Sequence, residues 1–319
     1  MNQHDDFAAV ELPMAAATPL AYALVNRIAA DHGVRVLAIK GPLLQKLGLR
    51  SQKVSGDADV LVEPSKMSEF CDVLAGYGWR DREVRFSPSI LDPHSRTLIH
   101  GNWPCDIDVH SYFPGFFGNA GDVFDFLWES RIERELAGVL VVTPSRVANG
   151  VITLLHLLRN SSSARHDAQY TEVMTALAQD MDAEQLFMLG RLADVGRCRQ
   201  VMETELKQLG VDGPFNDLTA SELARWEINR RTSPQATTGG WLYAITAADW
   251  RSKISIFISA IYPSTEELRK DPGMAESDPP GTGQDAGEAA AAGHPDVALR
   301  ISKPFQEPGE LNGHLVQGA

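Results

Sequence analysis

Two short segments place acidic side chains on predicted strands, and they constrain this chain more than any other feature. In the first, Asp57 and Asp59 open an apolar run; in the second, Asp106, Asp108 and His110 alternate with apolar residues. Side chains two apart on a strand point to the same face, so each segment presents its polar groups to one point in space. Carboxylates gathered in this way are typical of a site for a hard divalent cation.

A turn suited to phosphate lies upstream of the first acidic segment. The apolar, β-branched run 34–39 predicts a buried strand, and Lys40-Gly41-Pro42 follows it. Glycine allows the backbone to approach a ligand closely, and proline suits the first position of a helix, here expected over 42–47. The amino end of that helix and the charge of Lys40 would favour a phosphate group.

The acidic residues match the needs of nucleotidyl transfer, in which two cations stabilise the attacking and leaving oxygens. Such a site needs three carboxylates on a rigid sheet, two of which are Asp57 and Asp59. Asp106 and Asp108 share a predicted face, so the pattern alone leaves open which is the third. Oxygen ligands favour Mg²⁺ or Mn²⁺. His110 would orient a carboxylate, touch the acceptor or serve a structural role.

The order of these motifs resembles the uncharacterised nucleotidyltransferase family of the polymerase-β-like superfamily. The resemblance rests on Lys40-Gly41, on the basic Lys53 before the Asp-Ala-Asp-Val-Leu-Val strand, and on the acidic-apolar-His pattern ending at His110. It covers about residues 37–112 and extends weakly to His156, where the family tends to have a histidine on the first helix of a helical domain.

The resemblance implies the nucleotidyltransferase fold and Mg²⁺-dependent chemistry on an NTP. It assigns catalytic and metal-binding roles to Asp57, Asp59 and Asp108, and so favours Asp108 as the third carboxylate.

The residues predicted to bind the nucleotide are Lys40, Gly41, Lys53 and Gly56, and Arg50 is a further candidate for contact with the phosphates. Pro42 departs from the Gly-Ser or Gly-Gly turn of the wider superfamily and removes one amide donor.

The periodicity predicts an α+β protein with a small mixed sheet and flanking helices, followed by an all-helical domain. The expected elements are a helix over 19–32, strands over 34–39, 57–62, 105–110 and 139–142, extended runs near 84 and over 96–100, and helices over 64–76 and 122–128. The predicted organisation is a flexible N-terminus (1–18), a nucleotidyltransferase-like α/β domain (19–144), a helical domain (145–263) and a disordered acidic tail rich in Gly, Pro and Ala (264–319).

Composition narrows the class of partner. The formal charge of −13 disfavours long nucleic acids, whose binding depends on clustered cations. A small molecule, a peptide or a protein is therefore the expected acceptor. The three cysteines are widely spaced, and no apolar stretch is long enough to span a membrane, so a cytoplasmic protein with free thiols is expected.

The predicted function is transfer of NMP from an NTP to a hydroxyl or phosphate of an unidentified acceptor. One alternative uses the same site to transfer a phosphoryl group or a sugar phosphate. Another is a nucleotide-binding or partner-binding protein without turnover. His156, together with Arg159 one turn later, would face the cleft between the two domains or serve in packing.

Overall fold

The computed structural model describes residues 12–82, 94–159, 164–179 and 181–231. The predicted tail, the extended run near residue 84 and the end of the predicted helical domain (232–263) lie outside these residues. The strands are β1 (Val36–Ala38), β2 (Asp57–Val62), β3 (Arg80–Asp81), β4 (Ser95–Ile99), β5 (Asp106–His110), β6 (Ile132–Leu136) and β7 (Val139–Thr143).

Five of these strands form a mixed sheet in the order β1-β2-β5-β4-β3. The central strands β2 and β5 are parallel, whereas the other neighbouring pairs are antiparallel. The remaining two strands, β6 and β7, pair as an antiparallel hairpin. The predicted α+β class with a small mixed sheet is confirmed.

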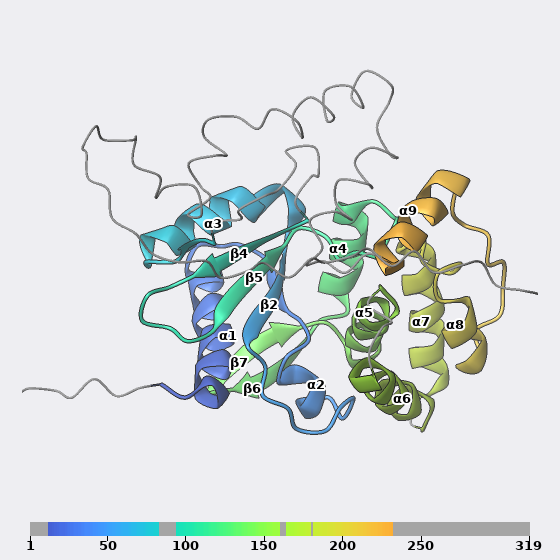
Figure 1. Cartoon of the computed structure of the whole chain (residues 1–319), viewed down its shortest axis with the longest axis horizontal. Helices are drawn as coiled ribbons and strands as arrows, with labels where there is room; N and C mark the ends of the chain where they lie inside the picture. Colours follow the sequence, from blue (N-terminus) through green and yellow to red (C-terminus); the bar gives the residue numbers. More distant parts are fainter. Residues whose placement is uncertain (1–11, 83–93, 160–163, 180, 232–319) are drawn as a thin grey trace, which may run out of the picture. The chain divides into compact units, whose positions relative to one another are not determined.

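Helices flank the sheet (Figure 1). They are α1 (Met14–Asp31), α2 (Leu43–Lys46), the 3₁₀ turn η1 (Pro64–Lys66), α3 (Met67–Gly76), α4 (Ala120–Glu129), α5 (Arg146–Arg159), α6 (Ala164–Gln179), α7 (Ala183–Val195), α8 (Glu203–Gln208) and α9 (Ala220–Arg231). Every described element after β7 is a helix, as the all-helical second part predicts.

The two faces of the sheet belong to two different hydrophobic clusters. On β2, the side chains of Ala58, Val60 and Val62 pack with residues of α1 and α3. Leu61 points to the other face and packs with residues of α4, α5 and α7. Because Asp57 and Asp59 share the face of Leu61, the acidic side chains lie on the side of the sheet that the later helices cover.

One hydrophobic cluster joins the strands to the later helices. It contains Leu37 of β1 and Leu61 of β2 together with Leu154 of α5 and Leu189 of α7, all buried. The predicted domain boundary falls between Thr143, the last residue of β7, and α5. It stays a prediction, and the shared cluster shows that the two segments pack directly on each other.

Two elements differ from the predictions. Helix α1 begins at Met14 and contains Pro19, because the alanine-rich first turns favour a helix and the Thr18 hydroxyl donates to the Met14 carbonyl (3.3 Å). Strand β6 was not predicted. Its turn to β7 consists of Ala137 and Gly138, both with positive φ (49° and 77°), which suits a tight hairpin.

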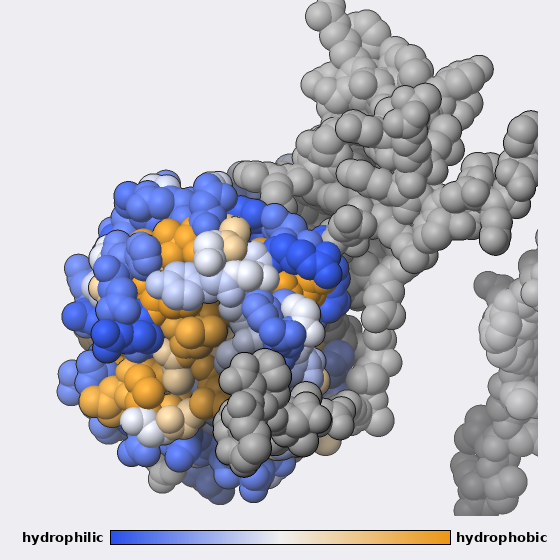
Figure 2. Space-filling view, turned by 90° about the vertical axis from the view of Figure 1, so that its left-hand side faces the viewer, coloured by the Kyte–Doolittle hydropathy of each residue, from blue (hydrophilic) through white to orange (hydrophobic). Residues whose placement is uncertain are grey.

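Figure 2 views the molecule from the side on which α1 and α3 lie in Figure 1 and shows hydrophobic residues among hydrophilic ones. Exposed large apolar side chains among the described residues include Leu20 of α1 and Tyr77, the residue after α3. Among the helices that the structure describes, none combines the length and apolar character needed to cross a membrane. All three cysteines are buried and free.

Candidate active site

The acidic residues form successive rows across the two central strands. In the parallel register of β2 and β5, Asp57 lies opposite Asp106 and Asp59 lies opposite Asp108. Leu61 and His110 form the next row along the same strands. The two acidic segments, about fifty residues apart in the sequence, therefore share one face of the sheet, as strand alternation predicts.

Asp59 lies at the centre of this face and is only 3% exposed. Its Oδ1 is 2.6 Å from the Lys40 Nζ and 3.1 Å from the His110 Nε2. Burial acts to raise the pKa of Asp59, but the charge of Lys40 and the hydrogen bond from His110 hold this pKa well below its usual range. Asp59 is thus a carboxylate kept ionised inside the protein.

Lys40 reaches Asp59 from a left-handed turn. Lys40 and Gly41 both have positive φ, 57° and 51°, a conformation that is uncommon for a lysine. The Lys40 amide donates to the Asn149 Oδ1 of α5 at 3.4 Å, and Arg50 donates to the Gly41 carbonyl at 2.7 Å. The turn is therefore held from two sides, which fixes where the Lys40 side chain begins.

Tyr22 of α1 links this turn to the acidic strand. Its buried hydroxyl donates to the Ile39 carbonyl at 2.8 Å and accepts from the Asp59 amide at 3.0 Å. A Cβ at Gly41 would lie 2.5 Å from the same hydroxyl, so the glycine is needed for this close approach. Burial and the nearby charge of Asp59 raise the pKa of Tyr22 well above its usual value, so the hydroxyl keeps its proton.

The helix after the turn is shorter than predicted. Helix α2 spans only Leu43–Lys46, one turn in place of 42–47. The Leu44 and Lys46 amides already bond to the carbonyls of Gly41 and Pro42. So short a helix has little dipole, and the expected contribution of its amino end to phosphate binding is not supported.

Three side chains on this face can approach one ion together. Asp59, Asp108 and His110 each offer a ligand atom, and these atoms lie within 4.8 Å of one another. Among the described residues, the Asp108 Oδ1 and the His110 Nδ1 are buried and have no hydrogen-bond partner. Buried polar atoms without partners are costly, so this donor set fits a divalent cation, which would give the Asp108 Oδ1 a partner.

Asp57 lies beside this group without belonging to it. It is half-buried and one pleat before Asp59 on the same face. Burial and the charge of Asp59 raise the pKa of Asp57 to about 6, although Lys40 acts in the opposite direction. A carboxylate crowded by other carboxylates gains most from a nearby cation.

Asp106 and Asp108 have different surroundings, which the sequence could not distinguish. Asp106 forms an ion pair with Arg82, which follows β3. Asp108 belongs to the three-residue group with Asp59 and His110, whereas Asp106 does not. The two aspartates thus differ in their contacts, and the role of Asp108 as the third carboxylate stays a prediction.

Helix α5 brings cationic and histidine side chains toward the acidic face, among them His156 and Arg159, for which the sequence left a place in the cleft and a role in packing as alternatives. Burial lowers the pKa of Arg159, while the charge of Asp59 acts to raise it. Burial, with the charges of Lys40 and Arg159, lowers the pKa of His156 to about 3. The Arg159 Nε and the His156 Nδ1 are buried without hydrogen-bond partners. These two atoms are suited to an anion close to the carboxylates.

His94 adds a neutral ring to the same region. It stacks on His110 with the ring centroids 6.0 Å apart. Burial, with the neighbouring His110 and Arg159, lowers the pKa of His94 to about 3. His94 reaches the site only through the tertiary fold, so spacing along the chain gave no signal for it.

The other predicted nucleotide-binding residues lie at the start of β2. Gly56 immediately precedes Asp57, and its carbonyl accepts a hydrogen bond from the Asp106 amide at 3.4 Å. The Lys53 Nζ lies 3.5 Å from the Gln169 Oε1 of α6. Their predicted contacts with a nucleotide stay predictions.

No protein-family model matches this chain, and no curated protein matches its sequence. Solved structures do resemble it. The similar structures include nucleotidyltransferases. One is an antigenic nucleotidyltransferase-like protein from Paracoccidioides brasiliensis, with a TM-score of 0.36, 10% identity, and coverage of 62% of this chain and 95% of that chain.

A second similar structure is the lincosamide antibiotic adenylyltransferase LnuA with lincomycin bound, with a TM-score of 0.30, 14% identity, and coverage of 56% of this chain and 96% of that chain. A third is a tRNA nucleotidyltransferase complexed with a primer tRNA and an incoming ATP analog. Its TM-score is 0.23 and its identity 14%, and the match covers 78% of this chain and 87% of that chain. The structural neighbours are thus of the class that the sequence motifs resemble. Because every TM-score is below 0.5, the proposals below rest on the residues of this chain.

Proposed function

We propose that this chain is a metal-dependent nucleotidyltransferase that moves NMP from an NTP to a hydroxyl or phosphate of an acceptor. The observation that supports this most strongly is the row of carboxylates on β2 and β5, faced by cations from two other elements. Lys40 lies on one side of Asp59, and Arg159 of α5 acts electrostatically on the same carboxylate. A site of this composition suits a cation and a polyphosphate bound together.

In this proposal Asp57, Asp59 and Asp108 hold the metal ions, which are Mg²⁺ or Mn²⁺. His110 has one of two roles in this proposal. It donates a hydrogen bond to Asp59 and so orients that carboxylate, or it binds the metal ion through a ring nitrogen together with Asp59 and Asp108. The bound cations would neutralise charge on the reacting phosphate and lower the pKa of the acceptor hydroxyl. Lys40 gives up part of its contact with Asp59 when a cation takes that position.

The phosphates of the donor lie between the turn and helix α5. Lys40 and Gly41 contact them from the turn, as the sequence predicts, with Lys53 and Gly56 at the entrance to β2. Arg159 and His156 contact them from the opposite side with donor atoms that have no protein partner. A guanidinium suits this role, because its planar fork of donors matches phosphate oxygens.

The chemical step is an in-line displacement at the α-phosphorus. The acceptor oxygen forms a bond to this phosphorus while the bond to the oxygen of the β-phosphate breaks, and pyrophosphate leaves with those electrons. Asp108 lies closest to the acceptor in this arrangement and takes the hydroxyl proton. The products are the nucleotidylated acceptor and pyrophosphate.

Calorimetric titration of each NTP into the full chain, with and without Mg²⁺, tests the donor site. Asp57→Asn is the test variant, and Asp106→Asn is the matched control, because the two residues are neighbours in the strand register. We expect at least one NTP to bind only with Mg²⁺, with affinity at least ten-fold weaker in Asp57→Asn and nearly unchanged in Asp106→Asn. No binding of any NTP to the wild-type protein would refute the proposal.

A product assay run beside the same titration separates the alternative functions. Metal-dependent binding without pyrophosphate release across hydroxyl-bearing acceptors would favour a nucleotide-binding protein without turnover. Formation of NDP and a phosphorylated acceptor, in place of pyrophosphate and a nucleotidylated acceptor, would indicate phosphoryl transfer, and binding of NDP-sugars in preference to NTPs would indicate sugar-phosphate transfer. The acceptor is proposed to be a small molecule, a peptide or a protein, and the cytoplasmic location stays a proposal.

A further inference from the structure

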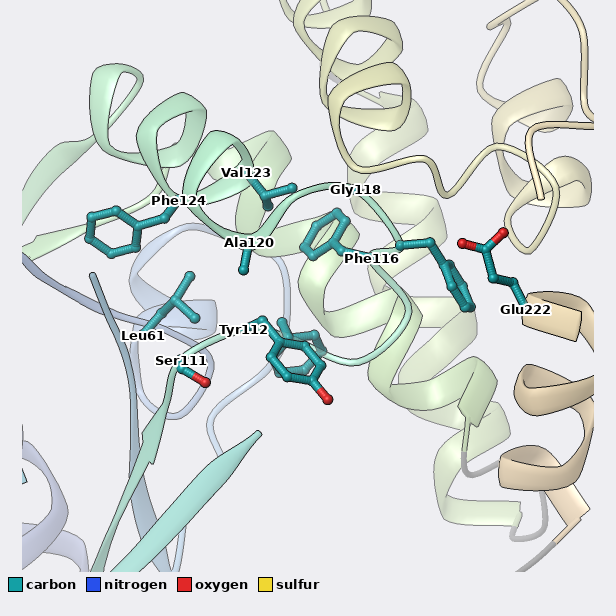
Figure 3. A pocket seen from close by; sticks show the side chains of 11 residues that line it. Leu61, Ser111, Tyr112, Phe116, Gly118, Ala120, Val123, Phe124 and Glu222 are labelled. Atoms are coloured by element: carbon teal, nitrogen blue, oxygen red, sulfur yellow. The ribbon is translucent and has the colours of Figure 1, made fainter. Parts of the chain in front are cut away.

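An aromatic pocket continues the acidic face of the sheet. It has a volume of about 240 Å³ and lies where the chain leaves β5 and enters α4. Its lining includes Tyr112, Phe113, Phe116 and Phe117 from this connection, and Phe124 from α4. Figure 3 shows Tyr112 and Phe116 on the connection and Phe124 on α4 among the side chains that line this space. None of the predicted site residues lines it.

The strand register connects this pocket to the carboxylates. Leu61 lines the pocket and lies two residues after Asp59 on the same face of β2, which places their Cα atoms roughly 6.5 Å apart. His110 lies opposite Leu61 on β5. The sheet face therefore passes from the row of Asp59 and Asp108 to the row of His110 and Leu61, and then to the pocket.

Phe113 is a wall shared by the pocket and the site. Its ring centroid is 5.8 Å from that of His110 and 5.6 Å from the Lys40 Nζ. The ring is nearly inaccessible to solvent, with 2% exposure. A ligand in the pocket would thus lie one aromatic ring away from the ion pair of Lys40 and Asp59.

The chemistry of the lining favours an uncharged ring. The side chains are mostly aromatic or aliphatic, and the charged member is Glu222. Both carboxylate oxygens of Glu222 are already paired with Arg197 at 3.0 Å. Aromatic walls bind planar apolar groups by stacking and by edge-to-face contacts. The volume of about 240 Å³ is below the range of roughly 300–1,000 Å³ that is usual for ligand pockets, so it suits a small group of one or two rings.

We propose that this pocket holds the apolar, ring-bearing body of the acceptor, and that the acceptor hydroxyl extends along the sheet to Asp108. The inference rests on the proposed nucleotidyl transfer for the role of the ligand. The phosphates of the donor are assigned elsewhere, because Lys40 pairs with Asp59 and Arg159 acts electrostatically on the same carboxylate, and neither cation lines the pocket. The substrate class is therefore an aromatic or polycyclic alcohol.

A filled-pocket variant tests the proposal. Ala120 is the first residue of α4 and lines the pocket, and Figure 3 shows its methyl group pointing into the space near Leu61 and Tyr112. Ala120→Leu adds bulk there from a partly exposed position. Ala183→Leu is the matched control, because Ala183 is the first residue of α7, is exposed and lies outside the lining. Both helices have a side-chain N-cap, Asn119 and Asp182.

The probe is naphthaleneethanol, a fluorescent two-ring alcohol, titrated into the full-length protein with glycerol as the polar comparison. We expect saturable binding of the naphthyl probe and no binding of glycerol. Affinity for the probe should fall at least ten-fold in Ala120→Leu and stay unchanged in Ala183→Leu. The affinity of both variants for Mg²⁺ and NTP should match that of the wild-type protein.

Three results separate the possibilities. Equal affinity for the probe in the two variants would overturn the pocket assignment. Displacement of the probe by NTP would assign the pocket to the nucleobase of the donor and overturn the acceptor assignment. Probe binding that depends on Ala120, in a protein that binds no NTP, would support the pocket and refute the proposed nucleotidyl transfer.

Discussion

Tyr22 is the side chain that fixes the distance between the Lys40 turn and Asp59. Its hydroxyl satisfies the Ile39 carbonyl and the Asp59 amide inside the core. Tyr22→Phe removes that oxygen and leaves buried polar groups without a partner, so we expect a loss of about 1–3 kcal/mol in the free energy of unfolding. Urea denaturation measures this loss.

Tyr77→Phe is the control for Tyr22→Phe, because Tyr77 is 49% exposed. Its free energy of unfolding should stay within about 0.5 kcal/mol of the wild-type value. If Tyr22→Phe were as stable as Tyr77→Phe, the hydroxyl would contribute nothing to holding the turn on the strand.

The sequence predicted individual side chains well where strand alternation decides their direction. Asp57, Asp59 and Asp108 share a face because residues two apart on a strand must do so, and a parallel register then joins the strands. The ion pair of Asp106 with Arg82 depends on how the β3 region folds back on β5, which no spacing encodes. For Arg159, helical spacing grouped it with His156 but could not decide between the cleft and packing, since that depends on how α5 packs on the sheet.

Helix α9 is attached to the rest of the protein through Glu222. Thr219 and Glu222 form reciprocal hydrogen bonds at the start of this helix, and Arg197 binds both carboxylate oxygens. The hydrogen bonds from Arg197 and Thr219 lower the pKa of Glu222 to about 2. The ionised carboxylate therefore stabilises the folded state.

Because the pKa of Glu222 is lowered in the folded state, the stability of the protein should fall as the pH falls. The stabilisation is fully present above the pKa of the unfolded chain, 4.5, and is lost as the pH falls toward about 2. Glu222→Gln keeps the size of the side chain but has one acceptor oxygen in place of two and no charge to titrate, so its Tm should fall less than that of the wild-type protein over this range. Differential scanning calorimetry at several pH values measures the effect.

Glu133→Gln is the control for Glu222→Gln, because Glu133 is exposed on β6. Its Tm should follow the wild-type curve. A Glu222→Gln curve parallel to the wild-type curve would mean that the pair with Arg197 has no effect on stability.

Elements were predictable where the local pattern was long and periodic. Strand β2 spans 57–62 as predicted, because a continuous apolar run follows its acids. Helix α2 is shorter than predicted because the chain turns away after one helical turn, with the Leu47 and Leu49 side chains buried. Strand β6 was missed because its alternate residues are exposed, and pairing with β7 rather than hydrophobicity defines it.

At the level of the whole chain, the shared cluster predicts cooperative unfolding. Residues of β1 and β2 pack in the same hydrophobic cluster as residues of α5 and α7. Loss of either part would expose the apolar surface of the other, so we expect the described part of the chain to unfold in a single transition. Calorimetry and circular dichroism should give coincident midpoints.

Tryptophan positions allow a local test of this cooperativity. Trp79 is buried beside the sheet, and Trp226 is buried in α9. One variant would keep Trp79 and lack Trp226, and the other would keep Trp226 and lack Trp79. The fluorescence of both variants should give the same midpoint of unfolding in urea. Two resolved midpoints would show that the predicted α/β and helical domains unfold independently.

The most direct test of the metal centre is Mn²⁺ binding, followed by the loss of the electron paramagnetic resonance signal of free Mn²⁺. Wild-type protein, Asp108→Asn and Asp106→Asn would be titrated in parallel, because the two aspartates lie on one face of β5 and only Asp108 belongs to the group with Asp59 and His110. We predict saturable binding to the wild-type protein and to Asp106→Asn, and at least ten-fold weaker binding to Asp108→Asn. Absence of Mn²⁺ binding to the wild-type protein, or equal weakening in both variants, would contradict the proposed site.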